Sequence, residues 1–83
     1  AKDDKGTVTV LLEAIKNYPD YSYSYYTLGE FYYNKGQTKE ALPYLNMYIE
    51  KTSGVEIEDP KTRLGINKNL RRAREMAEAA GKQ

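Results

Sequence analysis

The segment of residues 25–42 constrains the fold of this chain more than any other. Its large apolar side chains recur at i, i+3 and i+7, the spacing of one face of an α-helix. These residues are Tyr25, Leu28 and Tyr32. Gly29 lies beside them, where the absence of a side chain lets a second helix approach closely. Gly36 then supplies a turn, so the segment predicts two packed helices joined by a glycine turn.

Composition narrows the functions that this chain can perform. The 83 residues, of which 40% are apolar and 30% charged, suit one small soluble domain. Cysteine and histidine are absent, which excludes disulfides, thiolate metal sites and the commonest general base. Carboxylates such as Glu13, Glu30 and Glu40 therefore lack the partners that catalysis needs. We expect no enzymatic activity, no metal, no cofactor and, without a long apolar run, no membrane span.

Hydrophobic spacing and helix-breaking residues predict four helices. The expected helices span residues 5–17, 22–35, 39–51 and 60–80. Pro19 ends the first, because the residue before a proline is disfavoured in the α region. The expected N-caps of the other three are, in chain order, Asp20 or Ser22, Thr38, and Asp59. The expected buried stripe of the last helix consists of Ile66, Leu70, Ala73, Ala77 and Ala80.

Residues 20–53 carry a run of landmarks at fixed spacing. The landmarks are Tyr25, Leu28-Gly29, Tyr32, Gly36, Ala41 and Leu45. In this spacing the chain resembles the tetratricopeptide repeat family, whose unit is a helix-turn-helix of 34 residues. The resemblance extends backwards to a preceding half repeat through Leu11, Ala14 and Pro19. It departs from the family pattern at Tyr48, where a small residue is usual, and at Ser53, where proline is usual.

The resemblance implies the fold. We expect an all-α, four-helix, tetratricopeptide-like domain over residues 1–83, an antiparallel helix-turn-helix array stacked as a right-handed superhelix. One full repeat at about 20–53 follows the half repeat, and the helix at 60–80 closes the array over the helix at 39–51. Repeat arrays usually need about three repeats, so the chain is either a fragment of a longer scaffold or an engineered assembly.

The resemblance also implies a function, that of a protein-interaction scaffold. A second face of the helix at 22–35 would line a concave groove that holds a peptide or a partner helix. Its residues are Tyr23, Tyr26, Glu30, Tyr33 and Asn34. Tyrosine suits such a groove because its ring offers a large contact area and its hydroxyl tolerates water. A cationic clamp for a C-terminal carboxylate is not expected, since Asn34 has no Lys or Arg beside it on this face. Burial of these tyrosines under the first or the last helix remains an open alternative.

The last helix is basic. Residues 60–83 contain seven Lys/Arg and two Asp/Glu, whereas residues 1–59 contain six and ten. Arg71 and Arg72 are candidate electrostatic contacts for nucleic acid or an acidic protein. The i,i+4 spacings Arg71/Glu75 and Arg74/Glu78 favour an ordinary solvated face with internal ion pairs. The helix has no interleaved aromatic residues, which makes single-stranded nucleic acid a less favoured partner.

Three functional hypotheses follow from these patterns. The first is a scaffold that binds a protein or peptide through the tyrosine groove. The second is a designed or recombined helical protein without a natural ligand, and the third is a weak binder of nucleic acid or acidic protein through the basic helix. We expect a monomer, or weak self-association through an uncapped helix face. The compartment is left open, with a preference for the cytoplasm.

Overall fold

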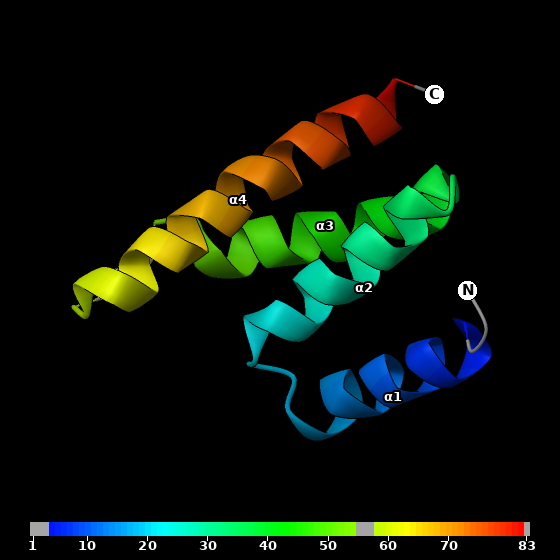
Figure 1. The fold of residues 1–83 in the computed structure, drawn as a ribbon, viewed down its shortest axis with the longest axis horizontal. Coiled ribbons are helices and arrows are strands. Elements are labelled where there is room, and N and C mark those ends of the chain that lie inside the picture. Colours follow the sequence, from blue (N-terminus) through cyan, green and yellow to red (C-terminus); the bar gives the residue numbers. More distant parts are fainter. Residues whose placement is uncertain (1–3, 55–57, 83) are drawn as a thin grey trace.

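The computed structural model describes residues 4–54 and 58–82 (Figure 1). These residues form four α-helices and no strand, which confirms the all-α fold predicted from the sequence. The helices are α1 (Asp4–Asn17), α2 (Ser22–Asn34), α3 (Thr38–Thr52) and α4 (Pro60–Gly81). Their bounds differ from the expected ones by at most about one residue, the usual uncertainty of a helix end. No helix in the described residues has both the length and the apolar character that crossing a bilayer requires.

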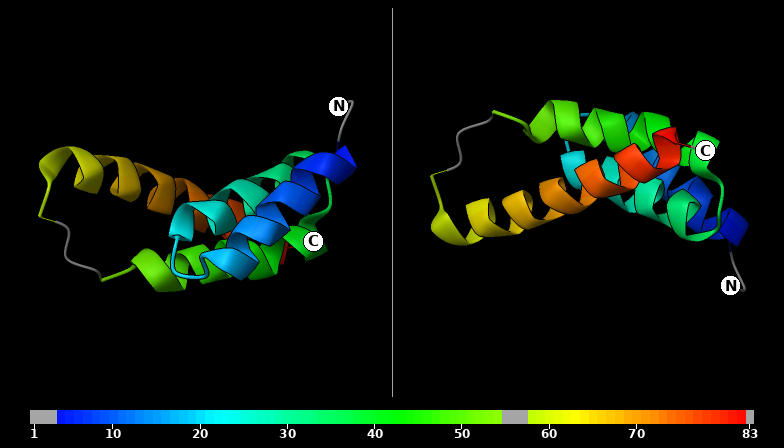
Figure 2. Two further views of the ribbon diagram at one scale, coloured as in Figure 1. Left: turned by 90° about the horizontal axis from the view of Figure 1, so that it is seen from below. Right: turned by 90° about the horizontal axis from the view of Figure 1, so that it is seen from above.

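The helices lie side by side in chain order, and each runs antiparallel to the one before it (Figure 1). The hairpin of α2 and α3 forms the centre, with α1 packed on one side of α2 and α4 packed along α3. Helix α4 also contacts α2. Helices α3 and α4 lie closest near the end of α4 and diverge toward its start (Figure 2). The first half of α4 therefore extends beyond the core.

The tightest contact in the hairpin is between Gly29 of α2 and Leu45 of α3. A Cβ atom built on Gly29 would lie 2.7 Å from Cδ2 and 3.2 Å from the backbone nitrogen of Leu45. Both Leu28 and Leu45 are completely buried beside this contact. The close approach expected from Gly29 is therefore present, and it brings the backbones of α2 and α3 together.

Gly36 makes the turn between α2 and α3. Its φ angle is +79°, a left-handed conformation that glycine adopts without steric cost. The Gln37 N–H donates to the Tyr32 carbonyl at 2.9 Å, and the Gly36 N–H donates to the Tyr33 carbonyl at 3.0 Å. This is the Schellman arrangement, which satisfies carbonyl groups left open at the end of a helix.

The three helix caps expected from the sequence have different outcomes. The Asp59 carboxylate accepts hydrogen bonds from the Thr62 N–H at 2.9 Å and from the Thr62 hydroxyl at 2.6 Å, as expected at the start of α4. These two bonds hold the pKa of Asp59 below its usual value. The predicted caps of α2 and α3 are wrong. Tyr21 and Gln37 occupy those positions without a side-chain bond, since Ser22 and Thr38 are already the first helical residues.

The buried stripe of α4 also differs in part from the expected one. Its buried residues are Leu70, Ala73, Met76 and Ala80. Met76 replaces Ala77 in the centre of the stripe, and Ala77 is only half-buried, as is Ile66. Helix α4 diverges from α3 toward its start, so Ile66 lies near the edge of the contact (Figure 2).

We predict that Gly29→Ala destabilises the protein, although alanine is the better helix former. The new methyl group would overlap the Leu45 side chain, at a cost of about 1–3 kcal/mol. This exceeds the gain in helix propensity of roughly 1 kcal/mol. The matched control is Gly65→Ala in α4, where no atom lies within 4 Å of the new Cβ, so that variant should be stabilised. The free energy of unfolding of both variants can be measured by urea denaturation followed by circular dichroism. Equal stabilisation of the two variants would contradict the close contact.

Candidate protein-interaction surface

The five residues predicted to line the groove lie along α2, but their exposure differs. Tyr23 is 50% exposed, whereas Tyr26 is only 5% exposed and belongs to the hydrophobic core. Glu30 and Tyr33 are half-buried, and Asn34 is exposed at the last position of α2. Helix α4 contacts α2, and its Arg72 reaches Glu30 in the middle of this face. The face is therefore divided into an end at Tyr23 and an end at Asn34.

At the first end, four tyrosine rings form a continuous row from the surface into the core. The tyrosine row consists of Tyr21, Tyr23, Tyr26 and Tyr48. The ring centroids are separated by 6.3 Å between Tyr21 and Tyr23, 5.9 Å between Tyr23 and Tyr26, and 5.1 Å between Tyr26 and Tyr48. The exposed fraction is 59% and 50% for the first two rings, and 5% and 1% for the last two. Two exposed rings thus rest on two buried ones.

The buried half of the row is held by α4. Burial raises the pKa of the Tyr48 hydroxyl, and a hydrogen bond from Asn69 of α4 opposes the shift. Burial also raises the pKa of Tyr26, as does the Glu30 carboxylate, while the charge of Arg72 and a hydrogen bond with it lower this pKa. Both hydroxyls therefore stay protonated at neutral pH and engage residues of α4.

Arg72, predicted as an electrostatic contact for a partner, instead pairs within the fold. Its Nε lies 3.0 Å from Oε2 of Glu30. The hydrogen bond with Glu30 raises the pKa of the Arg72 guanidinium, and a bond with Tyr26 acts in the same direction. The pair is partly exposed, so we assign it a positioning role between α2 and α4 and only a small contribution to stability.

Arg71, the second predicted contact, is exposed. The ion pairs expected for it and for its neighbour Arg74 do not form in the described residues. The Arg74 guanidinium donates to Ser53 Oγ at 3.0 Å, and Glu78 accepts from Lys82 at 3.3 Å. The order of the residues explains the difference, because a glutamate placed before its cation at i,i+4 is favoured over the reverse order.

The second end of the α2 face carries Tyr33 and Asn34. Tyr33 packs against the hydrophobic core and leaves only part of its ring at the surface. It lies ten residues after Tyr23, a rise of about 15 Å along the helix. The two ends of this face are therefore well separated along α2.

Two members of the tyrosine row, Tyr21 and Tyr48, were missed as site residues by sequence reasoning. Tyr21 stands two positions before Tyr23 and lies just outside the helix expected at 22–35. Tyr48 was noted only as a departure from the family's small residue. The large ring of Tyr48 was a usable signal of further packing at this position. A buried ring that replaces a small residue must be covered by another part of the chain.

The chemistry of this surface is set by its tyrosine side chains. Among the described residues no group of three His, Cys, Asp or Glu side chains could hold a metal ion. Tyrosine rings contribute apolar area and stacking, and their hydroxyls contribute hydrogen bonds. Between α1 and α2 lies a further hollow of about 390 Å³, lined by Gly6, Thr7, Val10, Leu11 and Thr27.

A comparison with protein-family models gave a match to one part of the chain. Residues 10–42 match the model described as tetratricopeptide repeat. The match supports a tetratricopeptide repeat assignment for this segment. The comparison with curated proteins found no match, and the comparison with solved structures found none either.

The matched segment agrees with the geometry of the helices. It covers most of α1, all of α2 and the start of α3, with the left-handed Gly36 turn inside it. Helix α4 lies outside the match. Tetratricopeptide repeats form a non-enzymatic type of scaffold and generally mediate protein–protein interactions.

We predict a loss of stability in alkali that depends on Tyr48. The pKa of its hydroxyl is raised above 10.0, so the folded state favours the protonated phenol. Stability should therefore be intact below about pH 10 and fall as the pH rises through the folded-state pKa. Tyr48→Phe should flatten this fall, whereas Tyr18→Phe, at a residue that is 68% exposed, should not. Urea unfolding across pH 8–11 tests this; an unchanged pH profile in Tyr48→Phe would contradict it.

Proposed function

We propose that this protein binds a peptide segment of a partner protein at the exposed end of the tyrosine row, where Tyr21 and Tyr23 make the contact. The observation that carries the proposal is the continuous row of ring contacts, with two exposed rings supported by two buried ones. The family's general role in protein–protein interaction supports it.

The support under the exposed rings matters for affinity. An interface side chain loses rotamer freedom on binding, and this loss is smaller when the side chain is already held. Tyr23 stacks on Tyr26 with an angle of 29° between the ring planes, and Tyr26 is fixed by Tyr48 and Arg72. Tyrosines on such a base act as rigid anchors with only two side-chain torsions each.

The ion pair between Glu30 and Arg72 sets the limit of the surface. A partner that contacts Tyr23 meets this pair before it reaches Tyr33 and Asn34. We assign Tyr26 and Glu30 a positioning role, and we assign Tyr33 and Asn34 a secondary contact patch for a partner long enough to pass the pair. The alternative of a helical protein without a natural ligand predicts that no peptide binds selectively at Tyr21 and Tyr23.

A peptide selection with matched variants tests the proposal. Peptides from a random phage-display library would be selected on the folded protein, and their affinities measured by fluorescence anisotropy. We predict that Tyr23→Ala weakens the selected peptides by about 1–2 kcal/mol, or roughly five- to thirtyfold in Kd, and that Tyr21→Ala has a similar but smaller effect.

Tyr18→Ala is the matched control, because Tyr18 is exposed and lies outside the row. It should leave the affinity within about twofold. Circular dichroism must show intact helicity for all three variants. Equal losses in Tyr23→Ala and Tyr18→Ala, or a library that yields no peptide sensitive to Tyr23, would refute the proposed surface.

A further inference from the structure

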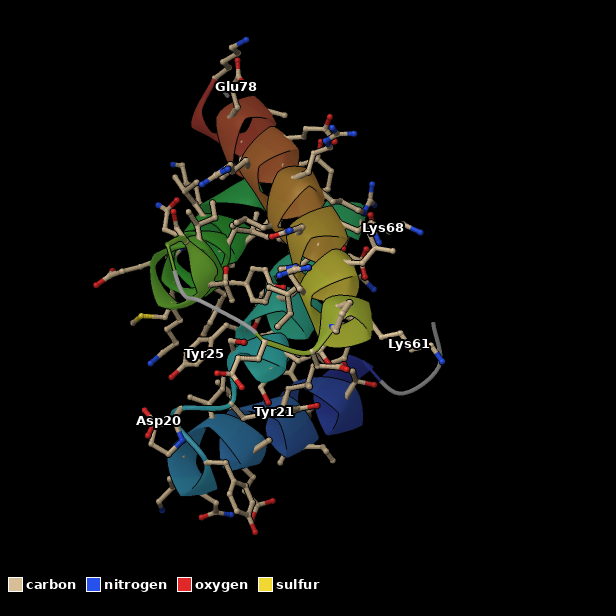
Figure 3. All side chains as sticks on the ribbon, turned by 90° about the vertical axis from the view of Figure 1, so that its left-hand side faces the viewer. Asp20, Tyr21, Tyr25, Lys61, Lys68 and Glu78 are labelled. Atoms are coloured by element: carbon tan, nitrogen blue, oxygen red, sulfur yellow. The ribbon has the colours of Figure 1, made fainter. Side chains whose placement is uncertain are left out.

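A second surface lies on the outer side of α4, away from its buried stripe. Lys61, Leu64, Lys68 and Arg71 follow one another at i, i+3, i+7 and i+10, which places them on one line along the helix. We call these four residues the α4 stripe. All four are exposed, and Leu64 has 73% of its surface open to solvent. Lys61 and Lys68 extend from α4 on the side away from α3 (Figure 3).

Within the described ranges, no carboxylate forms an ion pair with Lys61, Lys68 or Arg71. Lys61 and the nearby Arg63 also lie in the first turns of α4, where the helix dipole disfavours positive charge. These cations therefore do little for the stability of the fold, and their field is available to an outside anion.

The surface around the α4 stripe is hollowed in two adjoining places. One hollow of about 400 Å³ is lined by Leu64, Asn67, Lys68 and Arg71. The next, of about 360 Å³, shares Asn67 and Arg71 with it and continues to Arg74 and Glu78. The α4 stripe spans ten residues, or about 15 Å, which is the length of a short peptide.

We propose that the α4 stripe binds an acidic peptide segment of a partner protein. Carboxylates of the segment pair with Lys68 and Arg71, and a neighbouring apolar side chain covers Leu64 in the first hollow. The charge of the surface selects the acidic partner, since the helix carries six Lys/Arg against two Asp/Glu over Pro60–Gly81. The apolar Leu64 among cations favours a peptide over nucleic acid. Phosphate groups make no favourable contact with Leu64, and α4 has no aromatic ring for base stacking.

A short synthetic peptide that alternates glutamate with leucine is the probe, and its binding is followed by fluorescence anisotropy. We expect Arg71→Gln to raise its Kd about fivefold, and Leu64→Ala to raise it by a similar factor. Arg63→Gln is the matched control, because Arg63 is an exposed arginine on the same helix that lines neither hollow. It should change the Kd by less than about twofold. Tyr23→Ala should also leave this Kd unchanged, which separates the two surfaces.

Four outcomes would overturn the proposal. One is no binding of the glutamate-leucine peptide at low salt, and another is an equal loss in Arg71→Gln and Arg63→Gln. The third is that a short duplex DNA binds more tightly than the peptide and that Leu64→Ala leaves the binding of this DNA unchanged. This result would assign the surface to nucleic acid. A matched glutamine-leucine peptide should bind weakly, and tight binding of it would remove the electrostatic basis.

Discussion

The contact between the rings of Tyr26 and Tyr48 joins three of the four helices. Their centroids lie 5.1 Å apart, and both rings are buried. Tyr48 stands on α3 where the family pattern has a small residue, so its ring needs a cover, which Tyr26 of α2 provides from one side. Helix α4 completes the cover, since Asn69 hydrogen-bonds Tyr48 and Arg72 bonds both Tyr26 and Glu30. The placement of α4 therefore depends on these two rings.

The same contact divides the molecule into surfaces with different chemistry. Because α4 lies over the middle of α2, the aromatic surface is limited to the rings that project beyond it. Among the described residues, Lys61, Lys68 and Arg71 on the outer side of α4 form no ion pair, whereas the core side carries small and apolar residues. A single helix thus supports the proposed tyrosine surface from below and presents the proposed basic surface on its opposite side.

Local chemistry made much of the fold predictable. Helical spacing, the glycine turn at Gly36 and the cap at Asp59 depend on neighbouring residues only, and the resemblance to the repeat family located the close packing at Gly29. The site was predicted less well, because the burial of Tyr26 and the pairing of Arg72 depend on where α4 lies, and α4 falls outside the repeat pattern. The caps of α2 and α3 were wrong because their polar residues stand one position away from the helix boundary.

A double-mutant cycle on Tyr26 and Tyr48 tests the central claim most directly. The free energy of unfolding would be measured by urea denaturation for Tyr26→Leu, Tyr48→Leu and the double variant. If the two rings support each other, the losses should be non-additive, with a coupling energy of about 0.5–1.5 kcal/mol, and each single variant should loosen α4 in amide hydrogen exchange. Additive losses with unchanged protection of α4 would contradict the account.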